Sequence, residues 1–212
     1  MKNLGILLFI LGLAFINSCS STSNKPANGK AANAEVKKGI TPIADPEIAV
    51  IEMEQPAFGT IKMELYSNVA PKMVARFKEL ANEGYYDGII FHRVNPSVIQ
   101  AGNSDTKPGK TPNPAKEGDS GKPNVEAEFS DIPYDTGILG AARTQDVNTA
   151  NAQFFITLKR EQGFDNKYTI FGKVIDGMNN VRTIAGVPKD GEKPSEPVRI
   201  KHISIVPRDQ AK

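Results

Sequence analysis

The chain has 212 residues, a formal net charge of +2, 39% hydrophobic residues and 24% charged residues. This length suits one domain with an appendage, and the composition excludes a mainly disordered chain and a multispan membrane protein. The balanced charge lacks the basic excess of a nucleic-acid-binding surface. One cysteine and two histidines cannot form an intrachain disulfide or a thiolate zinc site, so we expect no metal.

The N-terminus carries a short apolar run. Lys2 precedes thirteen apolar or small residues from Leu4 to Ile16. This run is too short to span a bilayer comfortably and is typical of the hydrophobic region of a signal peptide. We therefore predict that residues 1–18 are a signal peptide that is removed.

The residues around the only cysteine form a second signal. Residues 16–19 read INSC, which resembles a bacterial lipobox, although Asn17 is less usual at its position. The resemblance implies that Cys19 is lipidated with diacylglyceryl and acyl (palmitate) chains and becomes the first mature residue. The alternative is ordinary cleavage near Ser18, which leaves a free cysteine. The lipidated form predicts a cell-envelope protein facing the periplasm, and Ser20 favours the outer membrane.

The next segment has the composition of a linker. Residues 19–45 are rich in Ser, Asn, Ala, Lys, Gly and Pro and lack an apolar period, so they cannot bury enough surface to offset ordering entropy. We predict a flexible tether that lets the domain sit roughly 25–30 Å from its anchor. The predicted domain is 46–208, followed by a tail at 209–212.

Within the domain, hydrophobic periodicity predicts many short strands and two helices. Residues 47–53 and 58–65 read as a hairpin, and Pro71 opens a helix that Gly84 ends. A second helix is predicted over 176–186, with apolar residues on one side. The remaining predicted strands are 89–94, 98–101, 137–142, 152–158, 168–174 and 198–206.

Eight strands without regular strand and helix alternation favour a mainly β fold. We expect a closed eight-stranded antiparallel β-barrel capped by two α-helices, rather than a doubly wound parallel sheet. The stretch 105–135 is rich in glycine and proline and is predicted to be a loop. In the last strand, alternation places Val198, Ile200 and His202 on one face.

Three segments of the domain resemble a known family when they are taken together and in order. Residues 91–96 read FHRVNP and 100–102 read QAG, residues 137–143 read GILGAAR and 153–156 read QFFI, and residues 164–174 read FDNKYTIFGKV. They are similar to the signature segments of the cyclophilin-type peptidyl-prolyl isomerases. The resemblance extends from about Ile48 to Ile205 and implies the same eight-stranded barrel with two helices, and no cofactor.

The reaction of that family explains why no acid, base or nucleophile is evident. An X-Pro bond isomerises over a barrier of about 18–20 kcal/mol because amide resonance must be broken. A catalyst needs a pocket for the proline ring, a donor for the twisted amide and groups that hold the flanking backbone. No covalent bond is broken, so no proton has to be moved.

The resemblance assigns roles to individual residues. Arg93 matches the catalytic arginine, whose guanidinium can donate to the prolyl nitrogen. Gln100 matches the glutamine that binds substrate backbone and orients the arginine, and Phe155 matches the aromatic floor of the proline pocket. The expected substrate-binding residues are His92, Val98, Ile99, Ala142, Arg143, Gln153, Phe164 and Tyr168.

The chain also departs from the family pattern. The stretch 96–100 is one residue shorter and lacks a phenylalanine, so Val98 and Ile99 are expected to supply the apolar pocket wall. Gly163 stands where many members carry tryptophan, which predicts poor sensitivity to cyclosporin. Tyr168 replaces a common histidine at the pocket rim.

The sequence thus predicts a lipid-anchored isomerase that acts on proline-containing unfolded or flexible envelope polypeptides. The alternative is a non-catalytic proline-peptide binding or chaperone module that uses the same groove, and a structural envelope lipoprotein is a third reading. We expect a monomer attached to the membrane through lipid on Cys19, with no nucleic-acid partner.

Overall fold

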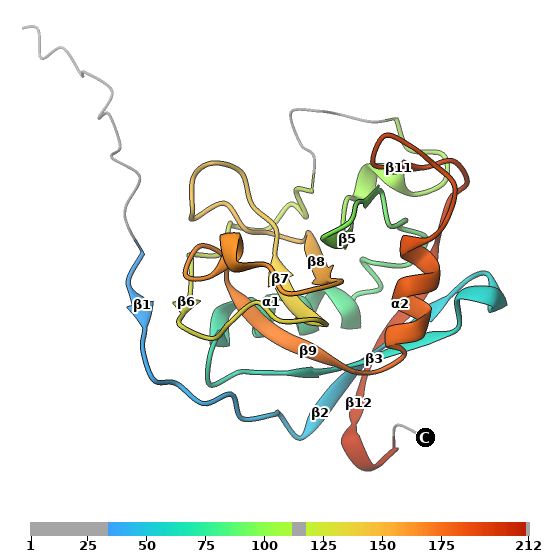
Figure 1. The fold of residues 1–212 in the computed structure, drawn as a ribbon. Coiled ribbons are helices and arrows are strands. Elements are labelled where there is room, and N and C mark those ends of the chain that lie inside the picture. The colour runs from blue at the N-terminus through green and yellow to red at the C-terminus, as the bar shows by residue number, and fades with distance from the viewer. Residues whose placement is uncertain (1–33, 112–117, 211–212) are drawn as a thin grey trace, which may run out of the picture. The chain divides into compact units, whose positions relative to one another are not determined.

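The structure is a computed structural model that describes residues 34–111 and 118–210. An eight-stranded antiparallel sheet, in the order β12-β2-β3-β9-β7-β8-β5-β4, forms its centre (Figure 1). The strands are β2 (Glu47–Met53), β3 (Thr60–Leu65), β4 (Arg93–Val94), β5 (Val98–Ala101), β7 (Ile138–Ala141), β8 (Phe154–Thr157), β9 (Ile170–Asp176) and β12 (Ile200–Pro207). All eight predicted strands are therefore confirmed, β2 and β5 with the predicted ends and the other six with shifted ends.

The two predicted helices are also confirmed. Helix α1 (Pro71–Asn82) has proline in its first turn, and Gly84 follows its end with φ of 67°, a left-handed conformation that favours glycine. Its apolar stripe, centred on Phe77, enters the main core, as do Val181 and Ile184 of α2 (Met178–Ala185). The helices therefore supply side chains to the sheet's concave interior, and α1 packs against β12 and β9.

The predicted closure of the barrel is wrong in one respect, because the strongly curled sheet stays open between β4 and β12. Strand β4 has only two residues, and the Val94 N–H donates to the Glu192 carbonyl at 2.7 Å rather than to β12. Just before β4, the chain meets the start of β12 through the isolated bridge Ile90–Arg199 and neighbouring hydrogen bonds. The two edges of the sheet therefore meet in a short contact instead of a continuous ladder of hydrogen bonds between β4 and β12.

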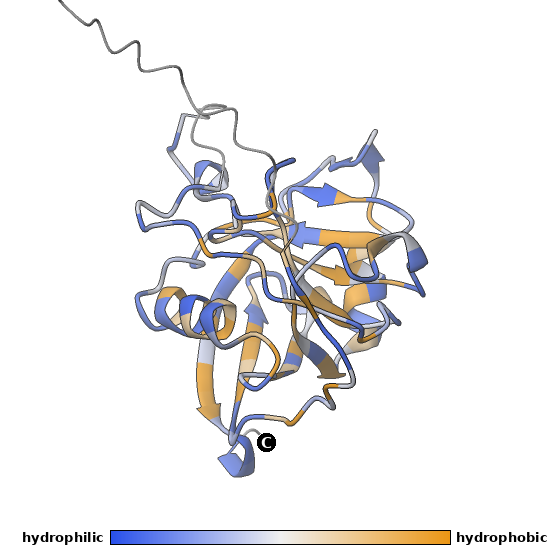
Figure 2. Ribbon diagram, turned by 90° about the vertical axis from the view of Figure 1, so that its left-hand side faces the viewer, coloured by the Kyte–Doolittle hydropathy of each residue, from blue (hydrophilic) through white to orange (hydrophobic). Residues whose placement is uncertain are grey.

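The sheet separates two hydrophobic clusters. The larger fills the concave interior with residues such as Ile99 and Phe154, both fully buried. The second lies on the other face of strands β5, β7 and β8 and contains Val98, Ile138 and Phe155; we call it the outer cluster. Figure 2 shows the hydrophobic residues concentrated along the strands and the hydrophilic ones in the loops. Because side chains alternate along a strand, one strand can serve both clusters.

Residues 34–45 lie along the domain as a strap, which differs from the predicted flexible tether through residue 45. Strand β1 (Val36–Lys37) pairs in parallel with β6 (Phe129–Ser130). The Lys37 Nζ donates to the Val69 carbonyl at 2.7 Å, and the Asp45 carboxylate accepts from the Lys78 Nζ at 2.7 Å. Residues 34–45, which lie before the predicted boundary at residue 46, are therefore bound to the domain.

The predicted signal peptide at 1–18 and the lipidation site Cys19 lie outside the described residues. Within the described part of the chain, neither helix has the length and apolarity that crossing a membrane requires.

The predicted loop at 105–135 is mostly irregular, and it supports α1. The buried Glu128 carboxylate accepts hydrogen bonds from the backbone N–H groups of Lys72 and Met73, at 3.2 and 3.0 Å. These are free donors of the first helical turn, and a carboxylate is favoured there by the helix dipole. The short hairpin β10 (Lys189–Asp190) and β11 (Lys193–Pro194) was not predicted.

Candidate active site

A small cavity lies over the outer cluster. Its volume is about 130 Å³, well below the roughly 300–1,000 Å³ of drug-sized ligand pockets, so it suits a single small ring. It gathers all three predicted catalytic residues and five of the predicted binding residues. The lining consists of Arg93, Val98, Gln100, Ala142, Arg143, Phe155, Phe164 and Tyr168.

The three catalytic candidates form one row across three strands, and Gly140 of a fourth strand continues the row. Arg93 of β4 is paired with Gln100 of β5, Gln100 with Phe155 of β8, and Phe155 with Gly140 of β7. Directly paired residues have Cβ atoms about 4.5–5.5 Å apart. The sheet register therefore places a guanidinium, an amide and an aromatic ring in line, although they are far apart in sequence.

Phe155 is the centre of an aromatic floor. Its ring centroid lies 5.9 Å from that of Tyr134, 5.5 Å from that of Phe164 and 5.7 Å from that of Tyr168. A Cβ atom at Gly140 would lie only 2.2 Å from the Phe155 ring. Glycine is therefore required there if the ring is to rest directly on β7.

Arg93 is held from two sides. Its Nη1 donates to the Gln100 Oε1 at 3.3 Å, and the Gln100 Nε2 in turn donates to the Gln153 Oε1 at 2.7 Å. On the other side, the Arg93 Nε donates to the Glu192 Oε2 at 2.5 Å. The guanidinium remains about half exposed, so a peptide can reach it from solvent.

Glu192 is a functional candidate that the sequence did not reveal. It lies in the turn of the β10–β11 hairpin, 99 residues from its partner Arg93. Hydrogen bonds from Arg93, and then from Asn95, lower the pKa of the Glu192 carboxyl below its ordinary value. The carboxylate is therefore charged at neutral pH and compensates the charge of Arg93.

Arg143 and Tyr168 form the opposite rim. The Arg143 guanidinium lies 4.5 Å from the centre of the Tyr168 ring, within cation–π distance, and its Nη2 donates to the Lys167 carbonyl at 2.7 Å. Gly163, next to Phe164, contributes no side chain to this rim. Phe164 supplies the aromatic surface there, packed against Tyr168 with ring centroids 5.1 Å apart.

The chain matches the family model described as "Cyclophilin type peptidyl-prolyl cis-trans isomerase/CLD" over residues 49–205. The chain belongs to the cyclophilin family of peptidyl-prolyl cis-trans isomerases. This match covers every strand of the main sheet except the ends of β2 and β12, and it includes the whole cavity.

Relatives of this cyclophilin agree with the assignment. It is 41% identical over 146 residues to a probable peptidyl-prolyl cis-trans isomerase of Brucella suis, covering 66% of this chain and 73% of the relative. It is 37% identical over 147 residues to a peptidyl-prolyl cis-trans isomerase of Schizosaccharomyces pombe, covering 69% and 92%. A crystal structure of a Cryptosporidium parvum cyclophilin in the presence of the dipeptide Ala-Pro matches with a TM-score of 0.64 and 30% identity, covering 74% of this chain and 98% of that chain.

Three of the predicted binding residues do not line the cavity of this cyclophilin. The prediction for Ile99 is wrong, because the alternation of β5 turns Val98 and Gln100 to the cavity and buries Ile99 completely in the interior. His92 donates its backbone N–H to the Gln100 carbonyl at 3.1 Å but is not part of the cavity lining. Gln153 acts one step away, by accepting from Gln100.

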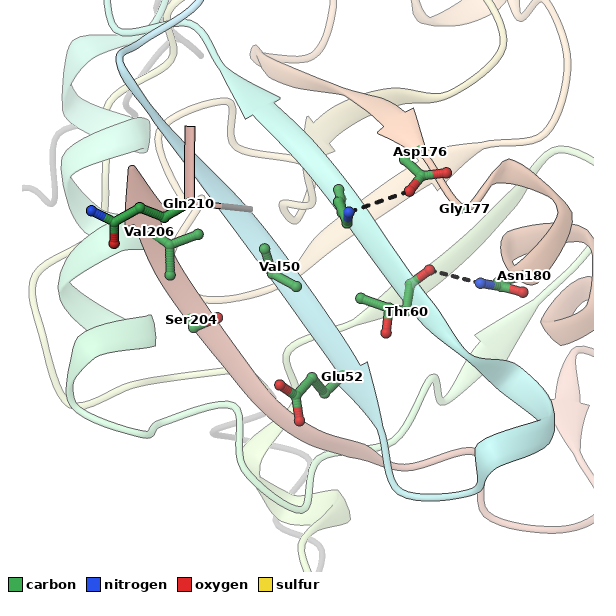
Figure 3. A pocket seen from close by; sticks show the side chains of 10 residues that line it. Val50, Glu52, Thr60, Asp176, Gly177, Asn180, Ser204, Val206 and Gln210 are labelled. Carbon is green, nitrogen blue, oxygen red and sulfur yellow. Dashed lines mark hydrogen bonds and ion pairs between the residues drawn. The ribbon is translucent and has the colours of Figure 1, made fainter. Parts of the chain in front are cut away.

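A larger cavity of about 500 Å³ lies elsewhere, on the outer face of β12, β2 and β3 beside the start of α2 (Figure 3). It contains none of the predicted site residues and no aromatic side chain. Several of its polar groups contact one another, with the Lys62 Nζ 3.6 Å from an Asp176 carboxylate oxygen and the Asn180 Nδ2 donating to the Thr60 carbonyl at 2.7 Å. Nothing in its chemistry suits a proline ring.

Among the described residues, no three Cys, His, Asp or Glu side chains are placed to share a metal ion.

Proposed function

We propose that this cyclophilin accelerates the cis/trans isomerisation of X-Pro bonds in unfolded or flexible proteins of the bacterial envelope. The observation that carries the proposal is the row of Arg93, Gln100 and Phe155 around a cavity of about 130 Å³. A donor, a backbone-binding amide and an aromatic floor are the three parts that the reaction requires.

In the proposed mechanism, the proline ring rests on Phe155 against Val98 and Phe164, which together hold one side of the bond. As the amide twists, its nitrogen loses resonance with the carbonyl and becomes a hydrogen-bond acceptor. The Arg93 guanidinium, which stays charged at every working pH, donates to that nitrogen. The contact is stronger in the twisted state than in either planar state, so it lowers the barrier and not merely the free energy of binding.

The envelope location rests on the N-terminal sequence. A signal-peptide pattern at 1–18, a lipobox-like INSC and a polar segment after Cys19 support an exported, lipid-anchored enzyme facing the periplasm. Residues 34–45 are bound to the domain, so the proposed tether is confined to residues 19–33, which lie outside the described residues.

The activity is tested by exchange NMR on an Ala-Pro peptide with the full-length chain in detergent. Arg93→Ala is expected to reduce the acceleration about a hundredfold, the effect of removing one donor from a developing charge. Arg182→Ala, at an exposed arginine of α2, is the matched control and should retain full activity. Peptide shifts without accelerated exchange in the wild type would contradict isomerisation and favour the non-catalytic binding module.

The anchoring is tested separately by expressing the wild type and Cys19→Ser in a bacterium. The wild type should appear in the membrane fraction with the mass of three acyl chains at the new N-terminus, and Cys19→Ser should lose both. An unmodified Cys19 or a soluble wild type would contradict the lipid anchor without affecting the proposed isomerase activity.

A further inference from the structure

The hairpin β10–β11 brings one carboxylate to the catalytic arginine. Glu192 accepts from the Arg93 Nε at 2.5 Å, and a longer contact of 3.5 Å joins the Arg93 Nη2 to its other oxygen. That second oxygen also accepts from the Asn95 Nδ2 at 2.8 Å. The Glu192 backbone carbonyl accepts from the Val94 N–H at 2.7 Å. Glu192 is therefore fixed to β4 by both its side chain and its backbone.

These contacts divide the guanidinium into two edges. Glu192 takes the edge formed by Nε and Nη2, whereas Gln100 accepts from Nη1 at 3.3 Å. A guanidinium has five N–H donors in a rigid plane. These contacts use Nε–H, one hydrogen of Nη2 and one hydrogen of Nη1, which leaves one hydrogen on each of the two terminal nitrogens for a ligand.

We propose that Glu192 is a positioning residue for Arg93, which holds the guanidinium so that its terminal edge serves the substrate in the adjoining cavity. The inference rests on the proposed isomerase activity and adds a residue to it. A long, half-exposed arginine otherwise samples many rotamers, and each turnover would have to order it. A side chain that is ordered beforehand contributes its hydrogen bond in the twisted state without that cost.

An isolated exposed ion pair contributes little, but this one has additional restraints. Asn95 donates to the Glu192 carboxylate, and the Val94 N–H donates to the Glu192 backbone carbonyl, so both the side chain and the backbone of Glu192 are held. The Arg93 Nη1 contact to Gln100 is long at 3.3 Å, so Gln100 alone fixes the arginine weakly. The contact with the carboxylate is the stronger of the two, because both of its partners are charged and it is shorter, at 2.5 Å against 3.3 Å.

The test uses the full-length chain and the variant Glu192→Gln. This substitution keeps the shape of the side chain and the backbone bond to Val94 but removes the charge. We expect kcat for the Ala-Pro peptide to fall about fivefold with KM unchanged, because the ground state does not use the arginine contact. Glu192→Asp keeps a carboxylate on a shorter side chain, and its kcat should lie between those of the wild type and Glu192→Gln. Glu196→Gln, at an exposed glutamate of the same segment, is the matched control and should behave as the wild type.

A second readout does not depend on activity. The Arg93 Nε–H resonance should be visible and protected from solvent exchange in the wild type and in Glu196→Gln, and it should broaden in Glu192→Gln. If the wild type is active and kcat of Glu192→Gln is unchanged, the carboxylate does not position Arg93. If kcat rises, the carboxylate competes with the substrate for Arg93. Either result would overturn this inference and leave the proposed isomerase activity standing. A parallel loss of urea stability would also overturn it, by showing that Glu192 supports the hairpin instead. An inactive wild type would overturn the proposed function and this inference together.

Discussion

Phe154 and Phe155 are neighbours in β8, yet they belong to different parts of the molecule. Phe154 is fully buried in the interior, where its ring lies 5.4 Å from that of Phe77 and 5.6 Å from that of Tyr86. Phe155 points to the other face and packs with Tyr134, Phe164 and Tyr168. The interior cluster is enclosed by the sheet and both helices, whereas the outer cluster is open at the cavity.

The fold thus separates stability from function. An interior packed on all sides cannot change shape without a large cost in stability. An outer cluster with one open side can present an aromatic surface while its other contacts keep that surface rigid. Substitutions in the interior, in the outer cluster and in the strap test this separation.

Phe154→Ala should produce the largest loss of stability. The substitution removes a fully buried ring and leaves a cavity enclosed by aromatic side chains, which costs about 4 kcal/mol. The free energy of unfolding is measured by urea denaturation. The isomerase activity, divided by the concentration of folded protein, should equal that of the wild type. A lower activity per folded molecule would contradict the separation of the two clusters.

Gly140→Ala should disturb the outer cluster from below. The new methyl group would meet the Phe155 ring at 2.2 Å, so the ring must move toward the cavity, and overpacking of this kind costs about 2 kcal/mol. KM for an Ala-Pro peptide should rise because the proline pocket becomes shallower. Gly163→Ala, at an exposed glycine with no atom near its Cβ position, is the control and should change neither value.

Phe155→Leu should separate the two properties most sharply. The aromatic contacts with Tyr134, Phe164 and Tyr168 are lost, which costs about 1 kcal/mol of stability, but the apolar volume is largely kept. Activity should fall about tenfold, the equivalent of roughly 1.4 kcal/mol at the transition state, because the flat floor for the proline ring is gone. Unfolding curves and exchange NMR on the same samples provide both numbers, and full activity would show that the ring is not the floor.

Most of the fold could be predicted from the sequence because its strands and helices repeat apolar residues at clear periods. The two-residue strands β1 and β6 have no period to detect, so the strap looked like part of the tether. The alternation predicted for the last strand fails at a bulge between Ile200 and His202, which turns Ile203 into the core and leaves His202 beside Asp87. A bulge inserts one residue into the alternation, and nothing in the local composition indicated it.

The candidate site was predicted through motifs, and its errors have separate physical causes. Ile99 lies between Val98 and Gln100 in one strand, so its side chain must point to the opposite face of the sheet from theirs. The sequence therefore already indicated that Ile99 does not line the pocket. Glu192 had no such signal. Its contact with Arg93 depends on where a short hairpin meets the open edge of the sheet, and that is determined by tertiary packing.

The smallest effect is expected at the strap, which packs Ile40 against the outer cluster. Burial raises the pKa of the Asp45 carboxyl, but hydrogen bonds from Lys78 and Ser67 outweigh it and lower the pKa below its ordinary value of 3.8. Asp45→Asn removes the charge that Lys78 contacts at 2.7 Å and should cost about 1 kcal/mol at pH 7. The free energy of unfolding is measured in urea across pH.

The pH dependence identifies the cause of that loss. Because the folded-state pKa of Asp45 is lowered, its contribution is fully present above about pH 3.8 and disappears as the pH falls through the folded-state value. The wild type and Asp45→Asn should therefore converge in stability at low pH, whereas Asp209→Asn, at an exposed position, should match the wild type throughout. A constant difference would mean that the strap is held by shape and not by charge. If Asp45→Asn also loses isomerase activity at neutral pH, the outer cluster depends on the strap, and residues 34–45 would belong to the part of the molecule that supports the active site.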